Sequence, residues 1–85
     1  MNKFEKFCLG DIVATEYGEG IVIDVTDHNE IQIAFDDGRN IYWQQDEVVE
    51  LNKEDHQAYV RTHYDFYKNI CKMLWDRVKD QIITN

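Results

Sequence analysis

The hydrophobic and polar positions of the chain follow two different periods, one in each half. In the first half, apolar residues recur at every second position, which is typical of strands that bury one face. Strands are predicted over residues 12–15, 21–25, 31–35 and 40–44, with a turn and a last short strand within 46–51. Four or five strands in so short a stretch predict a small, strongly twisted barrel over residues 9–51, because an open sheet of this size would expose its edges.

Two glycines mark special backbone positions in this half. The run Asp36-Asp37-Gly38 lies between two apolar segments, where the positive φ that glycine accepts matches a hairpin turn. Gly20 precedes the alternating run of residues 21–25 and fits either a bulge or a close approach of another backbone.

The second half has the period of one helix, predicted over residues 53–82. No glycine or proline interrupts residues 53–85, and Asn52 is suited to cap the first turn. A helix over residues 53–81 would be roughly 43 Å long, whereas a barrel of short strands spans about 20–25 Å. The helix therefore either projects beyond the barrel or breaks and folds back.

The apolar surface of this helix is wider than one seam. One stripe follows 4-3-4-3-4 spacing from residue 60 to residue 78, and a second stripe lies beside it. Either one monomer buries both stripes, or the extra width is a surface for a second copy or a partner. On the second interpretation, a homodimer would use Tyr64, Tyr67, Leu74, Trp75 and Val78.

Length and composition limit the chain to one small domain. It has 85 residues and a mass of 10.2 kDa, and residues 1–85 are expected to share one core. No apolar run approaches the roughly 20 residues of a membrane span, and the first residues lack the apolar stretch of a signal peptide. We therefore expect a cytoplasmic protein with no membrane contact, in which two buried reduced thiols at Cys8 and Cys71 are favoured over a bridge between them.

The charge is concentrated in the first half. Residues 1–52 hold three basic and twelve acidic side chains, a net charge of −9, whereas residues 53–85 carry +1 and the whole chain −8. Such a surface repels phosphate backbones, so direct nucleic-acid binding by the first half is disfavoured and a protein with a basic surface is the natural partner. The residues predicted to contact it are Tyr17, Glu19, Asp36, Asp37, Tyr42, Trp43, Asp46 and Glu47.

The aromatic members of this set could form a binding site of their own. Tyr42 and Trp43 are adjacent in a predicted strand, so only one of them can face inward. An open aromatic and acidic patch is favoured over a closed cage for methylated lysine or arginine.

Three segments of the first half carry a resemblance to a known domain. They are GDIV (residues 10–13), YGEGIV (17–22) and IQIAFDDG (31–38). Over residues 10–51 the chain resembles the Tudor-like, SH3-type barrel at the C-terminus of UvrD/PcrA helicases. It is also similar to the RNA-polymerase-interacting domain of CarD and the transcription-repair coupling factor. The resemblance implies an SH3-like barrel that acts as a docking module, often for RNA polymerase, without catalysis.

Catalytic and metal chemistry find little support in the sequence. The chain has no serine, and neither cysteine has a histidine and a carboxylate placed beside it. His28 stands alone, while His56 and His63 are about 10.5 Å apart on a helix, too far to share one ion. We expect no enzyme, no metal and no cofactor.

Two other functions stay open at this point. Carboxylates spaced like phosphates would make the protein a DNA-mimicking inhibitor of a nucleic-acid enzyme. Alternatively, the helix could bind nucleic acid through its basic side chains, although acidic residues are interleaved with them. These basic residues are Arg61, Lys68, Lys72, Arg77 and Lys79.

Overall fold

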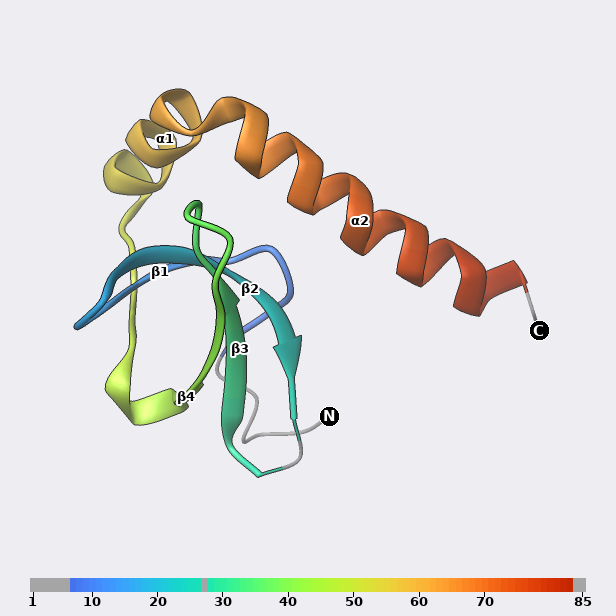
Figure 1. The fold of residues 1–85 in the computed structure, drawn as a ribbon, viewed down its shortest axis with the longest axis horizontal. Coiled ribbons are helices and arrows are strands. Elements are labelled where there is room, and N and C mark those ends of the chain that lie inside the picture. The colour runs from blue at the N-terminus through green and yellow to red at the C-terminus, as the bar shows by residue number, and fades with distance from the viewer. Residues whose placement is uncertain (1–6, 27, 84–85) are drawn as a thin grey trace.

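A five-stranded antiparallel sheet carries two helices on one of its faces (Figure 1). The computed structural model describes residues 7–26 and 28–83. The strands are β1 (Ile12–Thr15), β2 (Gly18–Val25), β3 (Glu30–Ala34), β4 (Asn40–Gln44) and β5 (Val49–Glu50), with a 3₁₀ turn η1 (Gln45–Glu47) between the last two. The helices are α1 (Lys53–Thr62) and α2 (Tyr64–Ile83). The prediction of a small strand-rich half followed by a helical half is confirmed.

The sheet is open rather than closed. Its strand order is β4-β3-β2-β1-β5, so β4 and β5 are its two edges, and no ladder joins them in the described part of the chain. β5 contains only two residues, and both pair with β1. Because η1 stands between β4 and β5, the chain crosses the opening with a 3₁₀ turn instead of a continuous strand pair.

The two faces of the sheet bury different sets of side chains, as the alternation predicts. On one face Val13, Val22, Ile31 and Ile33 form a core that includes residues from outside the first four strands. This inner core consists of Phe7, Val13, Val22, Ile31, Ile33, Phe35 and Val48. On the other face Ile12, Ile21, Ile23 and Ala34 pack against the helices. The β2–β3 register shifts between Val22 and Asp24, so the bulge lies beyond Gly20.

The chain breaks at His63, so the prediction of one continuous helix over residues 53–82 is wrong, whereas the alternative that the helix breaks is confirmed. His63 has φ −117° and ψ 41°, which ends α1, and α2 leaves in a new direction across the sheet (Figure 1). The break lets Tyr59 of α1 pack on Ile12 and Ile21, while Leu74 of α2 packs on Ile23 and Ala34. A straight helix about 43 Å long could not follow the twisted sheet closely enough to make both contacts.

The start of the helical half agrees with the prediction. The Asn52 side chain accepts a hydrogen bond of 2.8 Å from the Asp55 backbone N–H, which makes Asn52 the N-cap of α1. No described helix combines the length and the apolar character that a membrane crossing requires.

Candidate interaction surfaces

The eight residues predicted for partner binding occupy separate places. Three lie at the turns that connect the paired strands β1–β2 and β3–β4, namely Tyr17, Asp36 and Asp37, and Glu19 lies in β2 just after the first of these turns. Trp43, Asp46 and Glu47 lie on β4 and η1, at the open side of the sheet. Tyr42 stands apart from both groups. The structure therefore brings the set together as two surfaces rather than one.

The turn cluster, formed by Tyr17, Phe35, Asp37 and Arg39, is largely satisfied within the chain. The Tyr17 hydroxyl donates a hydrogen bond of 2.7 Å to Asp37 Oδ2, and its ring meets Phe35 edge-on at 4.8 Å. The Arg39 guanidinium lies 5.1 Å from the centre of the Tyr17 ring and 3.5 Å from Asp37. The hydrogen bond raises the pKa of Tyr17 and lowers that of Asp37. A basic partner would have to compete with Arg39 here.

Asp36 is also engaged within the chain. Its Oδ2 lies 3.0 Å from His63 Nδ1, which ties the β3–β4 turn to the junction of the two helices. The neighbouring Tyr59 is 3% exposed, and its hydroxyl has no hydrogen-bond partner in the described residues. Burial, helped by the charges of Asp36 and Glu19, raises the pKa of Tyr59 to about 12. These contacts give Asp36 a structural role at the helix junction.

A different arrangement occurs where the sheet fails to close. A cavity of about 250 Å³, here called the edge pocket, is lined by Glu16, Trp43 and Glu47. Glu16 directly follows β1, Trp43 lies in β4 and Glu47 lies in η1. The pocket is therefore lined from both sides of the opening. Trp43 packs its ring against the inner core. Its indole Nε1 is buried and has no hydrogen-bond partner among the described residues.

The edge pocket differs in charge from the turn cluster. Glu16 and Glu47 are exposed carboxylates, and no basic residue lines the pocket. Glu47 Oε1 accepts a hydrogen bond of 3.0 Å from the Gln44 backbone N–H, which fixes this side chain at the mouth. The site can therefore attract a cation next to an aromatic ring.

The adjacent aromatic residues on β4 point to opposite faces. Trp43 pairs with Ile31 on the inner-core side, while Tyr42 pairs with Gln32 on the helix side and remains 51% exposed. The prediction that only one of them faces inward is confirmed. Glu16 is absent from the predicted set, because its partners in the pocket are distant in sequence and nothing local marks it.

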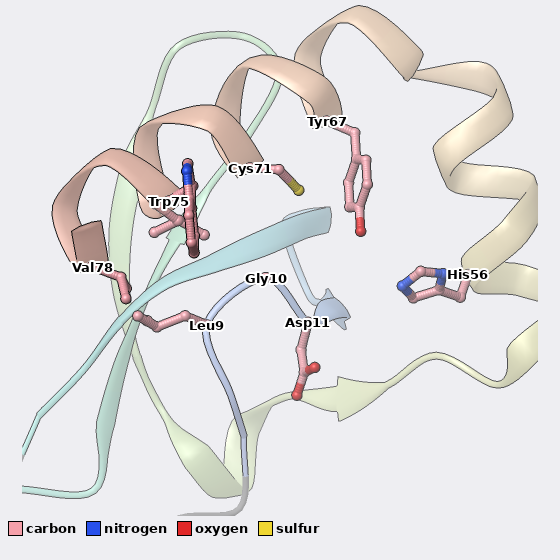
Figure 2. Close-up of a pocket in the computed structure, with 9 residues that line it drawn as sticks. Leu9, Gly10, Asp11, His56, Tyr67, Cys71, Trp75 and Val78 are labelled. Carbon is pink, nitrogen blue, oxygen red and sulfur yellow. The ribbon is translucent and has the colours of Figure 1, made fainter. Parts of the chain in front are cut away.

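The helices form a second candidate surface with two neighbouring hollows. The first hollow, of about 460 Å³, lies between α2, α1 and the segment before β1. Figure 2 shows the side chains of Tyr67, Cys71, Trp75 and Val78 along α2, opposite Leu9–Asp11. The second hollow, of about 540 Å³, includes Val60 and Tyr64 and shares His56 and Tyr67 with the first. The rings of His56 and Tyr67 meet edge-on at 6.2 Å.

The residues predicted for self-association all line these hollows. Tyr64 and Trp75 are 57% and 59% exposed, whereas Leu74 is only 7% exposed and is already used in packing on the sheet. Burial is the main cause that raises the pKa of Tyr67, and the adjacent Cys71 thiol raises it further. Both described cysteines are free thiols.

The basic side chains of the helix are partly engaged within the chain. Arg77 donates a hydrogen bond of 3.2 Å to the Ile23 carbonyl, Lys79 lies 3.8 Å from Asp76, and Lys68 lies 5.8 Å from the centre of the Tyr64 ring. In the described part of the chain, no group of three or more His, Cys, Asp or Glu side chains could hold a metal ion.

Comparison with protein-family models, with curated proteins and with solved structures gave no match.

Proposed function

We propose that this protein is a non-catalytic protein-interaction module whose edge pocket receives an arginine side chain from a basic partner. The observation that carries the proposal is the pocket itself, in which two carboxylates flank an indole at the unclosed side of the sheet. The net charge of −9 on residues 1–52 would draw a basic segment toward this side of the molecule.

The chemistry of the pocket favours arginine over lysine. A planar guanidinium stacks on an aromatic ring and donates hydrogen bonds to two carboxylates in one plane, whereas an ammonium acts as a point charge. The volume of about 250 Å³ is several times the about 30 Å³ occupied by one water, so there is room for a side chain.

Exposed ion pairs alone would bind weakly. Each is worth about 0–1 kcal/mol, so specificity has to come from the ring and from the exclusion of water around it. We therefore expect a single arginine to bind only at millimolar concentration, and a longer basic surface to bind more tightly.

The fold class and the partner belong to the same proposal. The strand order, the 3₁₀ turn between β4 and β5, and the inner core under a strongly curved sheet support an SH3-like module. The resemblance over residues 10–51 to docking domains of UvrD/PcrA and CarD makes bacterial RNA polymerase the first purified partner to test.

Nuclear magnetic resonance tests the pocket directly. Glycyl-arginyl-glycine is titrated into the full chain while the indole N–H signals of Trp43 and Trp75 are followed, with the same peptide carrying neutral citrulline as a control. We expect a saturable shift of the Trp43 signal with arginine and none with citrulline. Glu16→Gln should weaken binding by up to about fivefold, as expected for the loss of one exposed ion pair, whereas Asp46→Asn, a neighbouring acid that does not line the pocket, should leave it unchanged. Equal shifts with citrulline, or an unaltered response in Glu16→Gln, would overturn the proposal.

A further inference from the structure

The residues of α2 that line the two hollows without being fully buried have a symmetric spacing. Because Leu74 is buried on the sheet, the accessible seam runs through Tyr64, Tyr67, Cys71, Trp75 and Val78 instead. The steps between these residues are 3, 4, 4 and 3, which read the same in both directions from Cys71. A two-fold interface requires such self-complementarity, since each residue on one copy meets its symmetric counterpart on the other.

We propose that two copies of this chain pair their α2 helices antiparallel about a two-fold axis at Cys71. In this arrangement Trp75 of each copy packs against Tyr67 of the other, and Val78 packs against Tyr64. Trp75 then enters the second hollow, whose wall includes Val60 and which the monomer leaves empty. The two Cys71 thiols meet at the axis.

The distribution of charge favours a second copy over other occupants of these hollows. The helical half is nearly neutral at +1, whereas residues 1–52 carry −9. Contact through α2 keeps the two acidic halves apart. A basic partner would be drawn to the acidic half instead.

The accessible area predicts a weak dimer. An aromatic side chain can bury roughly 150–250 Å², so the exposed fractions of Tyr64 and Trp75 provide roughly 170–290 Å² per copy. Specific interfaces bury about 800 Å² per partner, and the remainder has to come from Leu9, Tyr67, Val78 and the polar rim. This places the interface at the small end of the range, where complexes are weak and transient.

Sedimentation equilibrium of the reduced full chain from about 1 to 500 μM tests the dimer. We expect a reversible monomer–dimer equilibrium that tightens with added salt, because each copy carries −8 and salt screens their repulsion. Trp75→Ala should raise the dissociation constant at least tenfold, while Met73→Ala, an exposed α2 residue that lines neither hollow, should change it less than twofold. Circular dichroism confirms that both variants are folded.

The native cysteines locate the axis. The Cys8→Ser variant retains only Cys71, and mild oxidation should convert its non-covalent dimers into disulfide-linked dimers. Adding Trp75→Ala should reduce the yield of linked dimer in proportion to the smaller fraction of dimer at equilibrium. A strictly monomeric chain at 500 μM, or a dimer that neither depends on Trp75 nor cross-links through Cys71, would overturn the proposal. The arginine titration is independent of this test, because Glu16→Gln leaves the α2 seam intact.

Discussion

Replacing Gly20 with alanine should strongly destabilise the fold, because β2 and β3 approach each other too closely for a side chain there. A Cβ atom at this position would lie 2.8 Å from the Ala34 carbonyl oxygen and 3.1 Å from Phe35 Cδ1, and closer still to Ile33 Cγ2. Ordinary contact begins at 3.4 Å, so the carbonyl alone would have to move by about 0.6 Å. Ile33 is fully buried and Ala34 pairs with Ile21 in the ladder, so neither neighbour can move independently.

The expected cost lies at the upper end of the range for overpacked cores, about 3 kcal/mol. For a domain of this size that corresponds to a fall of roughly 12–24 °C in melting temperature. Thermal and urea unfolding followed by circular dichroism measure both quantities. Gly38→Ala is the matched control, because its Cβ meets no atom within 4 Å and only its positive φ of 94° costs energy, about 1 kcal/mol. A Gly20→Ala protein as stable as Gly38→Ala would refute the reasoning.

Three further substitutions test single contacts. Tyr59→Phe should stabilise the protein by about 1 kcal/mol in urea unfolding, because it removes a buried hydroxyl that lacks a partner. The raised pKa of Tyr59, about 12, also means that wild-type stability is retained below pH 10 and falls between about pH 10 and 12, a loss that Tyr59→Phe should lessen. Asn52→Ala should cost about 1 kcal/mol through the lost N-cap, measured in the same way. Tyr17→Phe should raise the pKa of Asp37, which a carbon-detected titration measures. The Tyr17–Asp37 hydrogen bond stabilises the folded protein above pH 3.8, so the variant should lose less stability than the wild type as the pH falls below that value.

The strands and the start of the helix could be predicted because their signals are local. Alternation over residues 21–25 and 31–35 reflects which face is buried, and Asn52 caps the helix with its own side chain. Gly20 was expected at a bulge or a close approach, and the close approach is confirmed, whereas the register shift follows Val22. The length of the helix indicated that it either projects or breaks, but no local signal placed the break at His63. Apolar periodicity continues through it, and the contacts that accompany the break, Tyr59 on the sheet and Asp36 on His63, come from distant parts of the chain.

The candidate sites were predictable only in part, for a related physical reason. Composition identified an acidic first half, but it could not show that Asp36 and Asp37 already have partners within the chain. Alternation showed that either Tyr42 or Trp43 faces inward without deciding which. The edge pocket depends on how the sheet curves, which brings Glu16 toward Trp43 and Glu47, and no pattern in one segment encodes that juxtaposition.

The two proposed surfaces lie on opposite faces of the sheet, so both can be occupied at once. Trp43 packs on the inner-core side, whereas α2 covers the opposite side, so pairing through α2 leaves the edge pockets of both copies accessible. A dimer would then present two arginine sites in a fixed relation. When both sites engage one partner, the overall affinity can exceed that of a single site by about 10²–10⁴. A millimolar dissociation constant would then fall to a micromolar one. If this coupling operates, Trp75→Ala should weaken binding to a surface with repeated arginines while leaving the single-arginine titration unchanged. Equal weakening of both would show instead that Trp75 acts on the pocket within one monomer.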